Sequence, residues 1–296
     1  MREIISIHLG QAGVQVGYSC LELFCLEHGI DLNGIMSQNT LENSSGFFKT
    51  FFSEAEPNKF TPRSVFVDLE PTAIDEIRMG NHRELFNPEQ LVSGKEDAAN
   101  NYARGQYTIG KEMISHALDS IRKLSNSCEN LQGFIIFNSI GGGTGSGFGN
   151  LLTENLCVDY GKKINLSFSI FPSSGLSTSI TETYNSIFGI HSQLNYVDCA
   201  FILDNEAIYE MSQKKLNIER PTYTNINRIA AQVISSITSP MRFSGSLNED
   251  LAELEKNLVP YDRLKFMLTS QNPFIPIDAQ YNNIYTSSMI SESAFE

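Results

Sequence analysis

The residues best suited to chemistry form a run of glycines broken by two hydroxyl side chains at 141–147, with the sequence GGGTGSG. Five glycines in seven residues allow backbone angles that side chains forbid, and they let N–H groups approach a ligand closely. The run lies between an apolar, strand-like stretch and a helical pattern from about Phe148, so the next helix adds the positive end of its dipole. This arrangement predicts a phosphate-binding turn rather than a flexible linker. It is not a Walker A sequence, because no lysine follows the last glycine, and it does not match G-x-G-x-x-G.

A second, weaker candidate for phosphate binding lies at the first strand-to-helix turn, with the sequence GQAG at 10–13. A glycine pair at the start of a helix is often only structural. Gln11 adds a side-chain amide that can reach a phosphate or a metal-bound water.

Two carboxylates, Asp68 and Glu70, follow the apolar stretch Ser64–Val67. Residues two apart in an extended chain lie on one face, so both side chains can point the same way. Beside a triphosphate they suit Mg²⁺, which prefers oxygen ligands and keeps several waters. Without the glycine turn, the same residues indicate a solvated loop before the helix that begins near Pro71.

The amides of Asn100 and Asn101 have two interpretations. They precede a helical pattern that starts at Tyr102, and their side chains suit the cap of that helix. The same amides, with their neighbouring N–H groups, equally suit a phosphate. The sequence does not decide between the two.

Positioning these residues requires strands that alternate with helices, and the pattern supplies both. Apolar stretches predict strands at 4–9, 64–67, 134–137, 164–171 and 200–203, and helical periodicity predicts helices at 10–27, at 102–124 and from about 148. Residues 33–60 are polar and predict a long loop. Strands separated by helices pair in parallel, so we expect a doubly wound, mostly parallel α/β sheet. Such sheets bind ligands beyond the carboxyl ends of their strands, where the glycine turn lies.

After these elements the pattern changes. Residues 223–241 carry a broad apolar stripe and predict a long, largely buried helix. Past Arg242, a short helix containing Leu251, Leu254 and Leu258 precedes a strand near 264–268. We expect this strand to open a second α/β domain.

Composition narrows the class of protein. The 296 residues are 41% hydrophobic, enough for a sizeable core, and the formal net charge of -13 disfavours nucleic acid and anionic membranes as partners. The five cysteines are odd in number and show no C-x-x-C spacing, which fits a reducing compartment better than disulfides or zinc. With neither a signal-peptide pattern nor a membrane-length apolar run, we expect a cytoplasmic protein.

Together these segments resemble the tubulin family. The glycine run is a signature that tubulins share with the related bacterial division-ring GTPase. Around it stand GQAG at 10–13, VDLEP at 67–71, GKEDAANNYARG at 94–105, DNEA at 204–207 and RPTYTN at 220–225. The flanking segments favour tubulin proper, and the matches run in family order along essentially the whole chain.

The resemblance implies that the chain binds GTP with Mg²⁺. The residues implied to surround the phosphates are Gln11, Ala12, Ser139, Gly142, Gly143, Thr144 and Gly145. Those implied for the metal are Glu70 and Asp68; for the ribose, Ser177, Thr178 and Glu182; for guanine, Asn205, Tyr223 and Asn227. An asparagine amide offers a donor and an acceptor to a base edge, and a tyrosine ring can stack on the base.

Within the family, the segments CLEHGI at 25–30, DCAF at 198–201 and NLVPY at 257–261 resemble the alpha type, although the N-terminal MREI resembles the beta type. Glu253 also resembles the alpha type, in which this glutamate enters the next subunit's site and positions the attacking water. The resemblance therefore implies that Glu253 is catalytic on a partner's GTP, whereas the chain's own GTP is trapped. Taken alone, the position indicates a solvated acidic first turn, with Asn248 as a candidate cap.

The implied organisation is a GTP-binding domain at 1–222, a core helix at 223–242 and an incomplete intermediate domain at 243–296. Tubulins continue well past the position of Glu296, so we expect a chain that is cut short, with the strand near 266 lacking sheet neighbours. Asn138 departs from the family, which has histidine there.

The implied function is an alpha-type subunit of the microtubule cytoskeleton that pairs with beta-tubulin. Other tubulin subunits in a filament and folding chaperones are the further partners expected. The alternatives are a GTP-binding interaction protein that does not polymerise, a degenerate copy with little stable fold, and, more distantly, a phosphate-cofactor enzyme.

Overall fold

A parallel sheet forms the centre of the computed structural model, which describes residues 2–36, 46–173, 175, 179–245, 250–276 and 286–295. In this part of the chain the sheet has seven strands in the order β5-β4-β1-β6-β7-β8-β9, every neighbouring pair parallel. Their bounds are β1 Glu3–Leu9, β4 Ser64–Asp68, β5 Leu91–Ser93, β6 Leu131–Ser139, β7 Ile164–Phe171, β8 Cys199–Asp204 and β9 Phe266–Leu268. The doubly wound, parallel α/β fold expected from the sequence is therefore confirmed.

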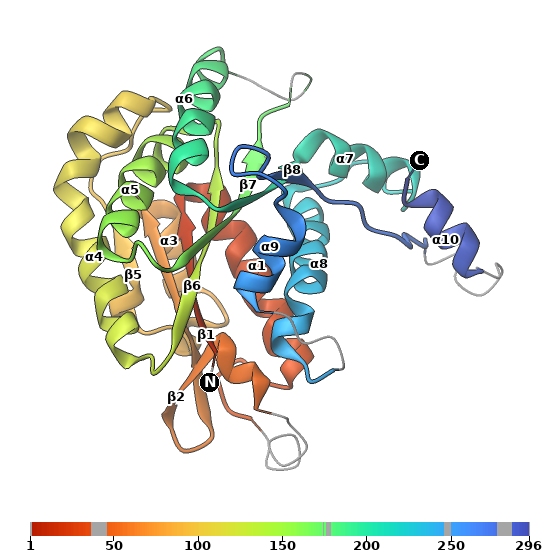
Figure 1. Ribbon diagram of the computed structural model, residues 1–296, viewed down its shortest axis with the longest axis horizontal. Coiled ribbons are helices and arrows are strands. Elements are labelled where there is room, and N and C mark those ends of the chain that lie inside the picture. The colour runs from red at the N-terminus through yellow and green to blue at the C-terminus, as the bar shows by residue number, and fades with distance from the viewer. Residues whose placement is uncertain are drawn as a thin grey trace.

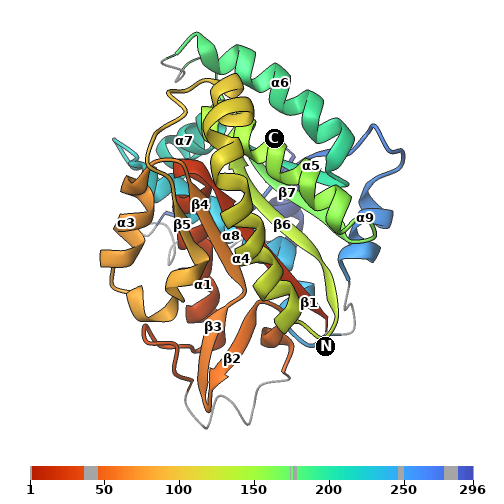
Figure 2. The same ribbon diagram turned by 90° about the vertical axis from the view of Figure 1, so that its left-hand side faces the viewer.

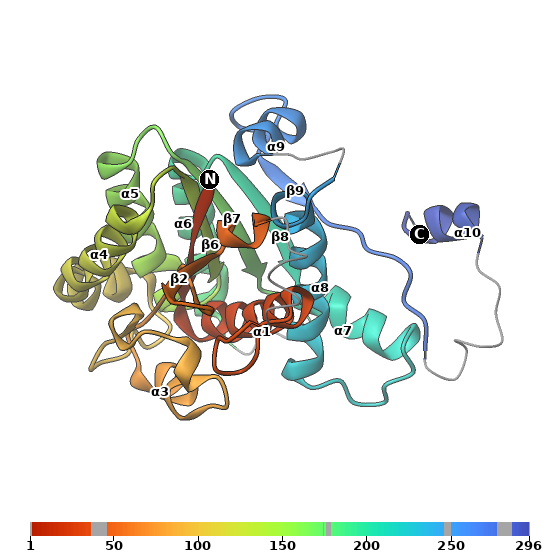
Figure 3. The ribbon, with the colours of Figure 1, turned by 90° about the horizontal axis from the view of Figure 1, so that it is seen from below.

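Helices cover both faces of the sheet, with α4 and α5 on one side and α1 and α8 on the other (Figures 1 and 3). The α-helices are α1 Gly10–His28, α3 Pro71–Met79, α4 Ile109–Ser127, α5 Gly149–Asp159, α6 Thr181–Tyr196, α7 Asn205–Lys214, α8 Tyr223–Arg242, α9 Leu251–Leu258 and α10 Ser287–Ser293. Shorter turns are η1 Phe47–Thr50, η2 Arg83–Leu85, η3 Pro88–Gln90, η4 Arg104–Thr108 and η5 Thr144–Phe148; η4 and η5 are π-helical.

Alternation along the strands divides the buried apolar residues between two cores. On β1, Ile5, Ile7 and Leu9 face α4 and α5, whereas Ile4 belongs to the core with α1 and α8. This is the period of two that a strand buried on both faces requires. On the α1 face, aromatic rings stack across neighbouring strands in the series Phe66, His8, Phe137, Phe168 and Phe201. Burial lowers the pKa of His8 to about 3, so its ring is neutral in this stack.

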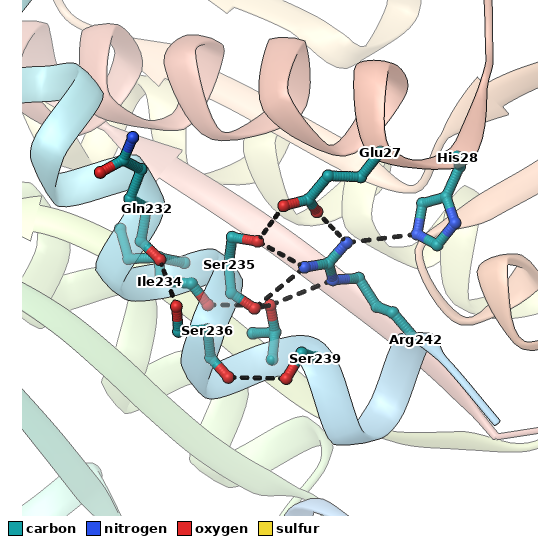
Figure 4. Close-up of polar contacts among 9 residues, drawn as sticks. Glu27, His28, Gln232, Ile234, Ser235, Ser236, Ser239 and Arg242 are labelled. Atoms are coloured by element: carbon teal, nitrogen blue, oxygen red, sulfur yellow. Dashed lines mark hydrogen bonds and ion pairs between the residues drawn. The ribbon is translucent and has the colours of Figure 1, made fainter. Parts of the chain in front are cut away.

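The C-terminal ends of α1 and α8 are joined by a buried arginine (Figure 4). The Arg242 guanidinium donates to a Glu27 carboxylate oxygen at 2.6 Å and to Nε2 of His28 at 3.2 Å, and it lies 4.0 Å from the centre of the Phe24 ring. It also donates to the carbonyl and hydroxyl oxygens of Ser235. These contacts fix α8 along α1, so the start of α8 is held beside the first turns of α1.

Residues 33–60 differ from the long loop that the sequence predicts. Where they are described, they contain η1 and an antiparallel hairpin, β2 Phe52–Glu56 and β3 Lys59–Pro62, and Asn58 adopts φ 66° between the two strands. Phe48, Phe52 and Phe60 are buried in the α1 core. The sequence did not predict the hairpin because the segment is mostly polar, and only a few aromatic side chains anchor it to the core.

The strand near residue 266 also differs from its prediction. Instead of lacking a sheet neighbour, β9 pairs in parallel with β8 and becomes an edge strand of the main sheet. Leu251 and Leu254 of α9 are buried in the α1 core as well. Among the described helices, none is both long enough and apolar enough to cross a bilayer.

Candidate functional site

The turns that follow β1 and β6 meet at one edge of the sheet. Because the seven strands of the main sheet are parallel, their carboxyl ends lie at this same edge. β4 and β5 extend the sheet from one side of β1, and β6 to β9 extend it from the other, so the strand order reverses beside β1 (Figure 2). Open α/β sheets bind ligands at such a reversal.

The glycine turn presents unpaired N–H groups there. The N–H groups of Gly142 and Gly143 donate to no carbonyl or side chain among the described residues, and η5 begins directly after them. A methyl group placed on Gly142 would meet no atom of the described part of the chain within 4 Å, so this residue borders open space there. Free donors at a helix start beside open space fit the oxygens of a phosphate group.

The first turn packs against this glycine turn. Gly10 has φ 68°, and an added Cβ would come within 3.3 Å of the Gly145 nitrogen and 3.4 Å of the Thr144 Cβ. Gly145 in turn lies against the backbone of Ser139, whose carbonyl oxygen would be 2.3 Å from an added Cβ. The structure thus brings Gln11 and Ala12, at the start of α1, to the same place as Ser139 and Gly142–Gly145.

A third turn joins them from β5. The backbone nitrogen of Asn101 would lie 2.6 Å from a Cβ on Gly143, so the two segments are in direct backbone contact. Asn101 accepts a hydrogen bond from the N–H of Ala103 at 3.0 Å, which is the capping role. The N–H of Asn100 donates to no described residue, which leaves it available to an anion. Asn101 therefore fits the interpretation as a helix cap, and Asn100 fits the interpretation as a phosphate-binding residue.

Two buried asparagines that the motif reasoning did not assign hold the glycine turn in place. Asn138 donates to the Gly145 carbonyl at 3.1 Å and accepts from the Ser169 hydroxyl at 2.8 Å. Asn185 of α6 donates to the Gly141 carbonyl at 2.9 Å. Only the substitution at 138 was visible in the sequence; nothing in the local pattern around Asn185 marked it.

The two carboxylates occupy different environments at the end of β4. Asp68 is buried and accepts from the Glu70 N–H at 3.4 Å, and burial raises its pKa to about 7 despite the neighbouring N–H groups. Glu70 is exposed and accepts from the Thr72 hydroxyl at 2.7 Å. No three histidine, cysteine or acidic side chains gather as a metal cluster within the described ranges. Mg²⁺ held by one or two carboxylates and phosphate oxygens needs no such cluster.

A cavity of about 420 Å³ lies between α1, α3 and the start of α8. Tyr223 and Asn227 line it from α8, and Gln15 lines it from α1. The Tyr223 side chain is exposed, so its ring face is free to stack on a planar group. Asn205 is the first residue of α7, directly beyond the carboxyl end of β8.

The model of the tubulin/FtsZ family GTPase domain matches residues 3–213. This match spans well over half of the 296 residues and includes the three turns described above. The chain belongs to the tubulin/FtsZ family. GTP binding is the activity of this family's domain, and the free N–H groups of the glycine turn fit its phosphates.

Of the other residues expected to contact the nucleotide in this tubulin/FtsZ domain, some lie in the described part of the chain and some do not. Glu182 lies at the start of α6, where its Cγ would be 3.5 Å from a Cβ on Gly141. Ser177 and Thr178 lie outside the described residues, as does Asn248.

Glu253 is not brought to the carboxyl edge of the domain. It is the third residue of α9 and accepts a hydrogen bond from the N–H of Asp250 at 3.2 Å, within a capping box. Asp250 forms an ion pair with Arg2, directly before β1. The seven residues of β1 span roughly 20 Å, so Glu253 lies near the opposite edge from the glycine turn.

Proposed function

We propose that the chain is an alpha-type tubulin subunit that binds GTP and Mg²⁺ and pairs with beta-tubulin in microtubules. The observation that carries the nucleotide proposal is the glycine turn at a helix start, with two N–H groups that have no partner among the described residues and open space beside Gly142. Backbone donors can bind a triphosphate without lysine, which suits a chain of net charge -13.

The proposed roles follow the three turns. Gln11, Ala12, Ser139 and Gly142–Gly145 surround the phosphates. Glu70 holds Mg²⁺, directly or through water, with Asp68 behind it. Ser177, Thr178 and Glu182 contact the ribose. The residues proposed for guanine are Asn205, Tyr223 and Asn227; the last two already border a cavity beside α1.

The proposed hydrolytic role of Glu253 is exerted in trans. Its place near the start of β1 supports this role, because the carboxylate lies about a strand length from the chain's own glycine turn. A partner subunit stacked on that end would receive the carboxylate beside its own nucleotide.

We further propose that the chain acts in the cytoplasm, on the microtubule cytoskeleton, and meets folding chaperones before assembly. The proposed division into domains remains 1–222, 223–242 and 243–296.

The test begins with the nucleotide that co-purifies with the chain in magnesium-containing buffer without chelator. We expect guanine nucleotide near one equivalent per chain, and added GTP should compete with a labelled guanine nucleotide where ATP does not. Absence of binding at saturating GTP and Mg²⁺ would contradict the proposal. Co-sedimentation with polymerising beta-tubulin then separates a microtubule subunit from a GTP-binding protein that does not polymerise.

A further inference from the structure

Asn185 is a buried side chain on α6 that joins three segments of the candidate site. Its side-chain nitrogen donates to the carbonyl oxygens of Gly141 and Asn100, each at 2.9 Å. Its side-chain oxygen accepts from the N–H of Tyr102 at 3.0 Å. One amide offers two N–H donors and one oxygen acceptor, so all of these groups are used. The side chain is only 4% exposed, which leaves no role for it as a surface contact.

The turn held by Asn185 has a costly backbone. Ala99 and Asn100 are consecutive non-glycine residues in the left-handed region, with φ 48° and 52°. Such residues persist only where the surroundings determine them, and they cluster at sites of function. Asn185 bonds the carbonyl at the end of this pair and the N–H two residues further on, so it holds the turn from both sides.

The same asparagine bonds to this turn and to the glycine turn, which lie in direct contact. The two segments touch backbone to backbone, since a Cβ on Gly143 would be 2.6 Å from the Asn101 nitrogen. The adjoining π-helical turns also touch, because a Cβ on Gly147 of η5 would be 3.1 Å from the backbone nitrogen of Gln106 in η4. The N–H groups without a partner among the described residues, those of Asn100, Gly142 and Gly143, therefore come from two segments in contact, and Asn185 bonds to both.

We propose that Asn185 is a positioning residue that sets the two halves of the phosphate site, 98–102 and 141–145, at the spacing a polyphosphate requires. The proposal rests on the proposed function, because it assumes that the ligand is a nucleoside polyphosphate. Asn185 touches no ligand in this role. It acts through the backbone groups that it holds, and it links their geometry to the position of α6.

The test replaces Asn185 with leucine, which has nearly the same shape but neither donor nor acceptor. The matched control is Asn165→Leu, near the start of β7. Asn165 is also a buried asparagine, but its side chain donates to the Tyr196 carbonyl at 3.2 Å and bonds to neither turn. Affinities for GTP and for guanosine, which lacks phosphates, are measured by competition against a fluorescent guanine nucleotide. Hydrogen exchange is followed on peptides that cover 98–106 and 141–148.

We expect N185L to weaken GTP binding at least tenfold and guanosine binding less than threefold, with faster exchange confined to the two turns. N165L should leave the ratio of GTP to guanosine affinity at the wild-type value. Equal losses for both ligands in N185L, or the same ratio change in N165L, would overturn the positioning role. If the wild-type chain binds no GTP, the proposed function fails. The exchange comparison, made without nucleotide, then still decides whether Asn185 holds both turns.

Discussion

Gly142 and Gly143 are neighbours in the glycine turn, but an added methyl group meets different surroundings at each. At Gly142 it enters open space, whereas at Gly143 it comes within 2.6 Å of the Asn101 nitrogen and 2.9 Å of the Ala98 Cβ. We expect Gly142→Ala to leave the melting temperature within about 2 °C of wild type and to weaken GTP binding at least tenfold. Gly143→Ala should instead lower stability by about 1–3 kcal/mol, as overpacking does. Thermal melts and GTP titrations of both variants check this, and an unchanged GTP affinity in Gly142→Ala would place the phosphates elsewhere.

At this scale, sequence reasoning located the residues that belong to motifs and missed those that support them. The glycine run can be recognised in the sequence because its function depends on the residue type and spacing themselves. Asn185 bonds to carbonyls 44 and 85 residues away, so its own neighbourhood contains no signal. The choice between capping and phosphate binding at Asn100 and Asn101 was also open, because it depends on backbone angles that tertiary packing imposes.

At the scale of elements, the contact between α1 and α8 should depend on pH through His28. Burial and the nearby Arg242 guanidinium lower the pKa of His28 to about 4, whereas the unfolded chain has a value near 6.5. The unfolded state therefore binds more protons between these values, and the contribution of His28 is fully present above about pH 6.5. It is lost as the pH falls towards 4, by roughly 3 kcal/mol at most.

Urea unfolding of wild type and His28→Gln, measured between pH 7.5 and 4.5, tests this dependence. Glutamine can still accept from Arg242 but does not titrate, so the stability advantage of wild type should shrink as the pH falls. His116→Gln, on an exposed part of α4, controls for the loss of an imidazole. A difference between wild type and His28→Gln that stays constant with pH would show that His28 does not titrate in this way.

The helices and strands were predictable where apolar residues recur at a regular spacing along a long segment. The strand Ile164–Phe171 and the helix from Tyr223 were predicted to within a residue or so of their observed bounds, because burial imposes a period of two or 3.6 on them. The hairpin β2–β3 was missed, because its stability comes from phenylalanines packed on α1 rather than from alternation along its strands. The π-helical turn near Arg104 was not predicted either, and it packs on a distant segment, since a Cβ on Gly105 would be 2.4 Å from the Gly143 carbonyl oxygen.

For the whole molecule, the parallel order of the strands was predictable, but the extent of the sheet was not. Nothing in the residues near 266 tells whether they pair with β8 or begin another sheet, because a short apolar run predicts a strand without naming its neighbour. In the structure β9 adds to the main sheet, and the division into domains at 242 stays a prediction. The arrangement leaves the glycine turn at one edge and Glu253 near the other, a geometry that gives an isolated chain no means of bringing them together.

Replacing Glu253 should therefore affect a partner's nucleotide and spare the chain's own. Glu253→Gln keeps the acceptor for the Asp250 N–H, so the capping box and the fold should survive. In assemblies with beta-tubulin, we expect GTP hydrolysis to fall at least tenfold, about 1.4 kcal/mol in the barrier, because a neutral amide orients water poorly and cannot take its proton.

GTP affinity of the isolated chain should be unchanged, and Glu255→Gln on the same helix should hydrolyse GTP as wild type does in the assemblies. Phosphate release and nucleotide content, measured on the same samples, separate these effects. A loss of nucleotide from the isolated Glu253→Gln chain would mean that the two edges communicate within one molecule, and the role in trans would have to be abandoned.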